Sequence, residues 1–494
     1  PQWPPEQSPP GGALIPATPP NGPPVAPQPQ PPQPPAAPQR PPVNHDIVGR
    51  LKKQVADQLH EIIAANPKLS EADRRQHGMA LINKAVGTWT KEVATKRGYP
   101  ATGAEYQAYV EAVYDAQFRH GRLQPYLDDQ NVENILINGF DEVWVDYADR
   151  PRQQVPPIAD SDEELVKFLQ ELGRRYGGNN AEREVSNANP MLALRLGDGS
   201  RLQAVVPPIT PKPFATVRRH LVKDIVLQDM IRLGTLDPIL AMFLQALVKA
   251  RKNILICGDQ GAGKTSLLRA MAREIPATER FATLETEYEL WLHQFHDQCV
   301  PMETRQANGE RVGEKADGSI SIGDMIPAAL RMTLSRMIVG EVRSDEIVYM
   351  LRVMTSGSGG SMSTMHVRKP DMIWDRIAEL CADSGVPADL AYRLAANAID
   401  FVVFVALVDE TQIGGRRHRF VSHVVEVAGG GEGAAPSRNT VFGPRGADPR
   451  AVPLLRPACS ADLRRVGFDL NYLDRFRERG QWPAPLDLKV RSLP

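Results

Sequence analysis

The sequence predicts an α/β fold, because short apolar strands alternate with amphipathic helices over most of the chain. Two segments carry this prediction most directly. Residues 253–257 form an apolar strand that enters a glycine-rich loop followed by a helix, and residues 337–341 form a second apolar strand that ends in an acid. A chain of 494 residues has room for two or three domains.

The first 43 residues have a composition unlike the rest of the chain. Of the 44 prolines, 19 lie within the first 42 positions, among Gln, Ala and Gly and with almost no apolar anchors. Such a segment cannot bury enough surface to offset the entropy of ordering, so residues 1–43 are predicted to form a disordered arm, partly in polyproline II conformation. A spacer role is favoured over a binding site for a proline-recognising partner, although both remain open.

Charge and cysteine content exclude several classes of protein. Lys and Arg number 58 against 59 Asp and Glu, for a net charge of −1, which argues against a whole-molecule electrostatic grip on DNA or anionic lipid; a local basic patch remains open. The apolar run 401–408 is far shorter than a membrane span, and no secretory signal opens the chain. The four cysteines lie far apart without a C-x-x-C pair, which argues against a zinc site or a disulfide framework and favours the reducing cytosol.

Residues 44–125 are predicted to be a helical segment. Apolar residues recur at spacings of three and four on one face of the first helix, namely Val48, Leu51, Val55, Leu59 and Ile62. Further helices are expected at 71–93 and 105–119. A supporting bundle and a docking module are both compatible with this pattern.

A small α/β domain is expected over residues 126–220. Residues 131–147 have the pattern of a strand, a turn at Asn138-Gly139 and a second strand. A helix is expected at 163–176, and a Gly197-Asp198-Gly199 turn separates a strand at 192–196 from one at 202–206. Residues 221–235 are expected to be a linker, followed by an apolar helix at 238–250.

The loop after the strand 253–257 matches the pattern G-x-x-x-x-G-K-[ST] between a strand and a helix. Its glycines allow backbone N–H groups to turn inward and, with the positive end of the helix, surround nucleotide phosphates. Lys264 can reach the β- and γ-phosphates, and the Thr265 hydroxyl can bind Mg²⁺. The predicted nucleotide-binding residues are Gly258, Gly261, Ala262, Gly263, Lys264, Thr265 and Ser266.

Acidic residues follow two further strands. Glu341 ends the strand 337–341, where α/β sheets place ligands, and it could orient and polarise the attacking water. Glu285 ends a strand at 281–285, with Glu289 close behind; these carboxylates could hold Mg²⁺ or form only a solvated acidic turn. His366 ends a strand at 362–366 after a Gly-Ser-rich loop, and this setting indicates a phosphate sensor as readily as a structural histidine.

In this order, the motifs resemble the type II and type IV secretion ATPases, and most closely the CpaF/TadA-type ATPases of Tad (Flp) pilus machines. The resemblance covers residues 121–427. It rests on the phosphate loop, on Ile135-Leu136-Ile137-Asn138-Gly139, on the run from Asp198-Gly199-Ser200-Arg201 to Pro208, on the segment from Arg331 to Arg343, and on a histidine box formed by Gly357 to Ser361, Thr364 and His366.

The resemblance implies roles for individual residues. Lys264 and Thr265 would bind ATP and Mg²⁺, Glu341 would act at the water, Glu285 and Glu289 would form the acidic box, and His366 would couple the γ-phosphate to domain movement. One or two of Arg201, Arg218 and Arg219 would face the nucleotide. One departure is Thr286, which stands where the family's acidic box usually has Asp. The lack of C-x-x-C pairs favours the Tad-like branch over zinc-bearing secretion ATPases.

The resemblance also implies an architecture and partners. The small domain would be PAS-like, residues 221–235 would be a hinge linker, residues 236–427 would be a RecA-like ATPase domain, and residues 428–494 would be a flexible break and a tail. We expect a homo-hexamer in the cytoplasm, held at the inner membrane through platform proteins of a pilus or secretion machine, with no specific nucleic acid partner. The alternatives are a conjugative or other type IV secretion ATPase, a nucleic-acid motor, and a scaffold that binds nucleotide without hydrolysis.

Overall fold

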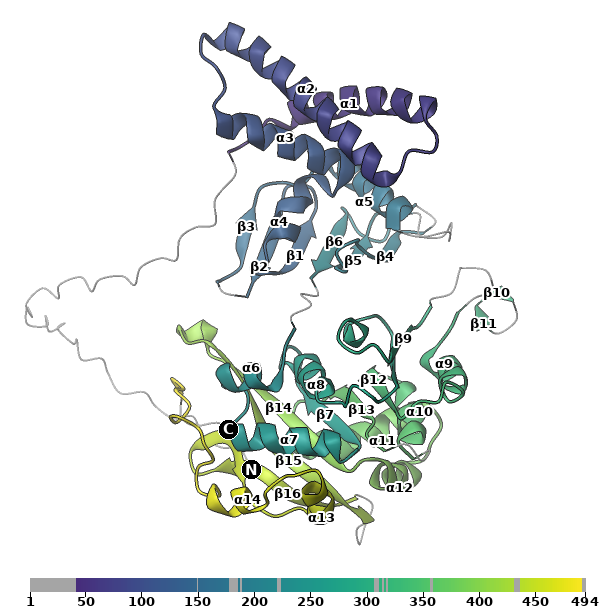
Figure 1. Cartoon of the computed structure of the whole chain (residues 1–494), viewed down its shortest axis with the longest axis vertical. Coiled ribbons are helices and arrows are strands. Elements are labelled where there is room, and N and C mark those ends of the chain that lie inside the picture. The colour runs from purple at the N-terminus through teal and green to yellow at the C-terminus, as the bar shows by residue number, and fades with distance from the viewer. Residues whose placement is uncertain are drawn as a thin grey trace, which may run out of the picture. The chain divides into compact units, whose positions relative to one another are not determined.

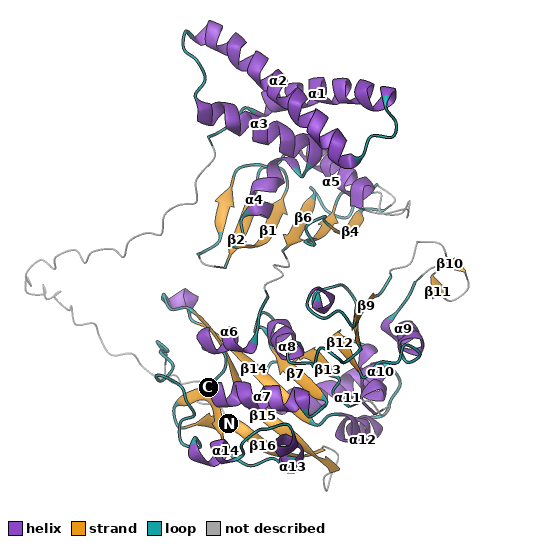
Figure 2. Ribbon diagram, in the orientation of Figure 1, coloured by secondary structure: helices purple, strands orange, loops and turns teal. Residues whose placement is uncertain are grey.

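The computed structural model describes residues 41–148, 150–176, 185–186, 189–219, 224–305, 311–312, 315–316, 319–355, 359–430 and 436–490. It divides into two compact units, residues 1–125 and 126–494, drawn in Figures 1 and 2. Nearly all of the predicted proline-rich arm lies outside the described residues. Within the described residues, no helix combines the length and the apolarity that spanning a membrane requires.

The first unit is a bundle of three helices, as the apolar spacing predicted. These are α1 (His45–Ala65), α2 (Glu71–Arg97) and α3 (Gly103–Phe118), followed by the short helices η1 (Gly121–Leu123) and α4 (Gln124–Asp128), the last of which runs into the second unit. Ser70 and Thr102 open α2 and α3 with reciprocal capping boxes. The apolar face of α1 packs against Ile82 and Val113. At Gly78 a side chain would collide with the Phe118 ring, so the missing Cβ lets α2 and α3 approach closely.

The second unit begins with an antiparallel sheet of six strands in the order β3-β2-β1-β6-β5-β4. The predicted hairpin is present, with Ile137 opposite Val143 and Gly139 at φ +78° in its turn. Helix α5 (Asp162–Tyr176) buries Leu165 and Leu169. The strands are β1 (Val132–Asn138), β2 (Val143–Tyr147), β3 (Gln153–Val155), β4 (Met191–Arg195), β5 (Arg201–Val205) and β6 (Phe214–Arg218).

A mixed sheet of nine strands follows, in the order β17-β16-β15-β14-β7-β13-β12-β8-β9. Strands β14 to β9 in this order are parallel, and β15 to β17 add an antiparallel extension. The strands are β7 (Ile254–Gly258), β8 (Phe281–Glu285), β9 (Cys299–Glu303), β12 (Arg336–Val342), β13 (Met362–His366), β14 (Phe401–Asp409), β15 (Arg417–Gly430), β16 (Pro436–Arg445) and β17 (Asp448–Pro453). A separate two-stranded ladder joins β10 (Arg311–Val312) and β11 (Lys315–Ala316).

Helices cover both faces of the nine-stranded sheet, which explains why its central parallel strands are buried on both faces and largely apolar. Ile254 and Ile256 of β7 face one core, with α7 and α8, while Leu255 and Cys257 face the other, with α9 to α12. The helices are α6 (Leu227–Arg232), α7 (Pro238–Lys249), α8 (Lys264–Ala272), α9 (Ile322–Ala329), α10 (Glu346–Thr355), α11 (Ile373–Asp383), α12 (Ala388–Ala398), α13 (Ser460–Arg465) and α14 (Asn471–Arg475). Single 3₁₀ turns occur at η2 (Leu292–Gln294), η3 (Pro370–Met372) and η4 (Thr411–Ile413).

Two predictions about the borders of this domain were wrong. The expected hinge linker 221–235 contains α6, whose Leu227 and Met230 are buried in the domain core, while residues 221–223 lie outside the described residues. The expected break and tail from 428 instead continue β15 to Gly430 and then supply β16 and β17. Glycine at 429 and 430 does not end the strand, because pairing with β16 resumes at Gly430 and Pro436.

Two carboxylates hold segment 481–490 through its backbone N–H groups. The Asp237 carboxylate, which caps α7, also accepts the N–H of Gln481. Glu410, at the end of β14, accepts the N–H groups of Lys489 and Val490 at 3.1 and 3.0 Å. The segment 481–490 is therefore attached to two distant parts of the domain.

Candidate nucleotide-binding site

The predicted phosphate loop lies between β7 and α8, at the carboxyl end of the parallel strands. Gly258, Gly261 and Gly263 have φ values of +155°, +73° and +97°, which other residues adopt only with strain. At Gly258 a Cβ would lie 2.3 Å from the Val405 carbonyl oxygen, so only glycine fits. No side chain caps the start of α8, which leaves its first N–H groups available to an anion.

Lys264 is directed back over the loop and is nearly fully buried. Its Nζ donates to the Asp259 carbonyl oxygen at 3.0 Å and lies 3.1 Å from Nδ1 of His366. Burial lowers the pKa of Lys264, while the nearby carboxylate of Glu341 acts in the opposite direction. The two predicted residues Lys264 and His366, which are far apart in the sequence, are thus in contact.

Glu341 lies beside them because β12 and β13 are neighbours in the sheet. One carboxylate oxygen, Oε1, is 2.6 Å from Nε2 of His366, and Oε2 accepts from Arg343 Nε at 2.6 Å. Burial opposes ionisation of Glu341, but the hydrogen bonds and charges of His366 and Arg343 prevail and hold its pKa at about 2. The strand end is fixed by Thr364, whose hydroxyl donates to the Gly340 carbonyl oxygen at 2.8 Å.

Glu285 is the most enclosed carboxylate of the site, with 2% of its surface exposed. Its Oε2 accepts the N–H groups of Glu289 and Leu290 at 2.7 and 2.8 Å, while Oε1 is buried without a hydrogen-bond partner among the described residues. Burial raises the pKa of Glu285 to about 7. A Cβ at Gly340 would lie 3.0 Å from Glu285 Cγ, so a glycine before Glu341 gives Glu285 its room.

The predicted arginines differ in where they lie. Arg201 pairs with Glu289 at 2.9 Å and with Glu287, and it lines a cleft together with Thr265, Glu285, Glu341 and Arg343. Arg218 does not line that cleft. It borders a separate cavity of about 420 Å³ together with Arg195, Arg201 and Glu303. Arg219 donates to the backbone carbonyl of Asp129 within its own domain.

The histidine box divides between the two ends of β13. Gly357 and Ser358 lie outside the described residues. The N–H groups of Gly360 and Ser361 donate to Asn253 Oδ1, each at 3.0 Å, at the start of β7. Because His366 stands at the other end of a strand with a rise of about 3.3 Å per residue, these residues do not support it at the phosphate loop.

Sequence reasoning missed three arginines that complete the site. Arg343 pairs with Glu341, Arg269 of α8 donates to the Glu289 carbonyl, and Arg419 of β15 donates to the Gly261 carbonyl. Arg343 is close to Glu341 in sequence and could have been noticed. The other two reach the site only through packing of α8 and pairing of β15, which the local pattern does not reveal.

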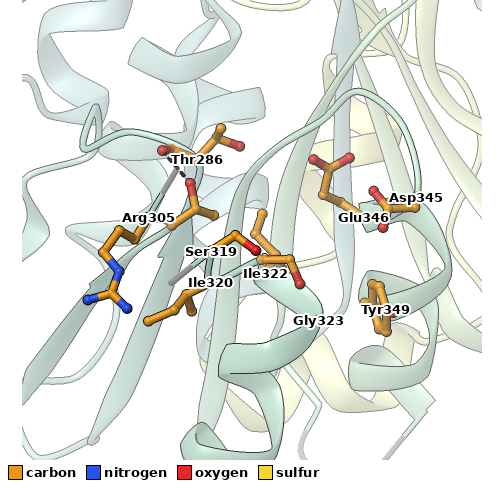
Figure 3. Close-up of a pocket in the computed structure, with 11 residues that line it drawn as sticks. Thr286, Arg305, Ser319, Ile320, Ile322, Gly323, Asp345, Glu346 and Tyr349 are labelled. Atoms are coloured by element: carbon orange, nitrogen blue, oxygen red, sulfur yellow. Dashed lines mark hydrogen bonds between the residues drawn. The ribbon is translucent and has the colours of Figure 1, made fainter. Parts of the chain in front are cut away.

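A second cavity, of about 220 Å³, lies on the far side of Thr286 (Figure 3). Thr286 and Arg305 line one side, and Asp345, Glu346 and Tyr349 of the α10 region line the other. None of the phosphate-loop residues borders it. Within the described residues, no three His, Cys, Asp or Glu side chains form a group that could hold a metal by themselves.

Comparison with known proteins identifies the family of the chain. The profile of the family described as "Type II/IV secretion system protein" matches residues 117–427. A Mycobacterium tuberculosis protein named for conjugal transfer is 31% identical over 296 residues, which are 58% of this chain and 80% of that protein. The type IV secretion system protein PtlH of Bordetella pertussis is 28% identical, with 60% of this chain and 91% of PtlH covered.

A further relative is the type IV secretion system protein VirB11 of Brucella suis, which is 26% identical over 60% of this chain and 88% of its own length. The family match covers the six-stranded sheet and the nine-stranded sheet as far as Val427 in β15, and it includes the phosphate loop and Glu341; β16 and β17 lie beyond it. The α/β fold with a RecA-like ATPase domain is confirmed. The chain belongs to the type II/IV secretion system protein family, and it is a nucleotide-binding ATPase of that family.

Proposed function

We propose that the protein hydrolyses ATP to power the assembly or secretion of pilin or protein subunits at an inner-membrane machine of the Tad (Flp) type. One observation supports the proposal above all: Lys264, His366 and Glu341 come from three different elements, and His366 contacts both Lys264 and Glu341 at the phosphate loop. This arrangement suits a site that detects and cleaves a terminal phosphate.

The loop amides, the first turn of α8 and Lys264 would bind the phosphates. Glu341, with a pKa of about 2, is ionised at every physiological pH and is too weak a base to remove a proton from water efficiently. It would therefore orient and polarise the attacking water. In the structure Lys264 is held by His366 and the Asp259 carbonyl, and it would exchange these partners for phosphate oxygens.

The residues of the cleft fit Mg²⁺, which prefers oxygen ligands and binds together with nucleotide phosphates. The Thr265 hydroxyl and the carboxylates of Glu285 and Glu341 line the same cleft, and the Glu285 oxygen without a partner belongs to this set. Thr265 would hold the ion, and Glu285 and Glu341 would hold its waters. When bound, Mg²⁺ would neutralise charge on the phosphate oxygens.

We further propose a homo-hexamer in which Arg201 faces the nucleotide from the small domain. Arg201 already lines the cleft, where Glu287 and Glu289 now balance its charge. A nucleotide phosphate could replace these carboxylates, so that the two domains would close on ATP and separate after hydrolysis. Arg218, at the neighbouring cavity, is the second candidate for such a contact.

Phosphate release by the purified chain tests the proposal directly. The Lys264→Ala variant should abolish turnover, because Lys264 is the loop's charged contact to the phosphates. Turnover by Lys264→Ala at the wild-type rate would contradict the site assignment. Sedimentation velocity with and without Mg-ATP would test the hexamer separately.

A conjugative or other type IV secretion ATPase is the second candidate, and the names of the similar proteins favour it. The two candidates share the chemistry and differ in the partner. Affinity purification from membranes with a variant locked in the ATP state would distinguish them. Recovery of pilin-machine platform proteins supports the first candidate, and recovery of type IV channel components supports the second.

A further inference from the structure

A side chain from the antiparallel part of the sheet reaches the phosphate loop. Strand β14 pairs with β7 so that Val405 lies opposite Gly258, and β15 pairs with β14 so that Arg419 lies opposite Leu407. β14 therefore lies between the strand that carries Arg419 and β7, which leads into the loop. Its Nε donates to the Gly261 carbonyl oxygen at 2.8 Å, and its Cδ lies 3.7 Å from the position that a Cβ on Gly263 would occupy.

This hydrogen bond fixes one side of the peptide that joins Gly261 to Ala262. The carbonyl oxygen and the amide hydrogen of a trans peptide point in opposite directions in one plane. On the opposite side, the Ala262 N–H donates to the Asp259 carbonyl oxygen at 3.2 Å, the same oxygen that Lys264 contacts. Arg419 thus holds the carbonyl outward while the N–H faces the interior of the loop.

The peptide needs such a restraint because of the residues around it. Gly261 and Gly263, on either side of Ala262, both have positive φ values, and glycine loses more conformational freedom on ordering than any other residue. A loop that samples other peptide orientations would bind phosphate less tightly, in proportion to the time spent in the competent form.

We propose that Arg419 is a positioning residue for nucleotide binding: by holding the Gly261 carbonyl from outside, it keeps the Ala262 N–H on the inner side of the loop, where that N–H would exchange the Asp259 carbonyl for a phosphate oxygen. It does not touch Lys264 or Glu341 by any contact in the described residues. The inference goes beyond the proposed function, since it depends on nucleotide binding by the loop and not on which machine the protein serves.

The expected signature is a change in affinity without a change in chemistry. Replacing Arg419 with Met, which has similar length and no donor, should weaken ADP binding and raise KM for ATP by about tenfold, the size expected for one charge-assisted hydrogen bond from an exposed side chain. The kcat should stay within about twofold, because binding is lost equally in the ground and transition states.

Two further variants separate the hydrogen bond from the charge. In Arg419→Gln the amide nitrogen occupies the place of Nε in the side chain, so this neutral variant should keep ADP affinity within about threefold of wild type. Arg416→Met is the matched control, because Arg416 is exposed in the same hairpin and does not contact the loop in the described residues. It should bind ADP like wild type.

Calorimetry with ADP and steady-state phosphate release with the full chain give the readouts, and circular dichroism confirms folding. Unchanged ADP affinity in Arg419→Met would overturn the proposal. So would a fall in kcat at constant KM, or equal losses in Arg419→Gln and Arg419→Met, because the charge would then be responsible. If Arg419→Met does not fold, the ADP affinities of Arg419→Gln and Arg419→Lys are compared instead. Lys keeps the charge but lacks a donor at the Nε position, so the proposal requires tighter ADP binding by Arg419→Gln than by Arg419→Lys.

Discussion

Replacing Glu341 with Gln should separate nucleotide binding from hydrolysis. The two side chains have the same shape, so the loop and Lys264 keep their geometry, while the charge that polarises the water is lost. Removing a positioned group of this kind lowers kcat by about 10²- to 10⁴-fold. ATP should still bind, because Glu341 does not belong to the phosphate loop.

Glu341→Gln should also lower the free energy of unfolding. The pKa of Glu341 is 4.5 without perturbation and about 2 in the folded chain. Since one pKa unit corresponds to about 1.4 kcal/mol, the ionised carboxylate contributes up to about 3 kcal/mol to the free energy of unfolding at neutral pH. This contribution is present above pH 4.5 and is lost as pH falls toward 2.

Urea unfolding and phosphate release, measured on the same preparations, test both parts. The control is Glu379→Gln, which breaks an exposed ion pair with Arg376 on α11 and should change neither quantity. Hydrolysis by Glu341→Gln within tenfold of wild type would refute the catalytic reasoning. An inflection assigned to Glu341 in the pH–rate profile between about pH 5 and 9 would refute the electrostatic reasoning, because the carboxylate should be fully ionised there.

The remaining predictions concern two other buried carboxylates. Burial raises the pKa of Glu285 to about 7, so its contribution to the free energy of unfolding is present below pH 4.5 and is lost as pH rises through about 7. Between about pH 5 and 8, wild type should therefore lose more free energy of unfolding than Glu285→Gln, as measured by urea unfolding. The same pH dependence of the unfolding free energy in both proteins would contradict this. Asp237→Ala removes the cap of α7 and leaves the Gln481 N–H unpaired, which should cost about 2 kcal/mol in thermal unfolding. Asp237→Ser keeps the cap and loses only the contact to Gln481, so it should cost about half as much; no loss in Asp237→Ser would show that the contact to Gln481 contributes nothing.

Much of the parallel core could be predicted from sequence, because its signals are local. The strands Phe281–Glu285 and Met362–His366 were predicted to the residue, and the glycine-rich loop was found between its strand and helix. A strand buried on both faces is usually apolar along most of its length, and a short apolar run bounded by charged or glycine residues has few other structures available.

The rest depended on pairing between distant segments. Gly429 and Gly430 have the pattern of a flexible break after a strand, and they belong to the sheet because β15 pairs with β16 as far as Gly430. Arg419 lies 158 residues from Gly261 and meets it because β14 stands between their strands. The Glu285 carboxylate was expected either to hold Mg²⁺ or to belong to a solvated acidic turn, and its bonds to the Glu289 and Leu290 backbone depend on a turn that the sequence does not specify.

The attachment of segment 481–490 through its backbone constrains how its sequence can vary among related chains. Asp237 and Glu410 accept backbone N–H groups of Gln481, Lys489 and Val490, so these contacts do not require a particular side chain, but they exclude proline, which has no N–H to donate. Related chains could therefore differ in the side chains at these three positions and still attach this segment in the same way. Conservation of this attachment would be visible in the carboxylates of Asp237 and Glu410, and in the buried side chains of Trp482 and Leu488 within the segment.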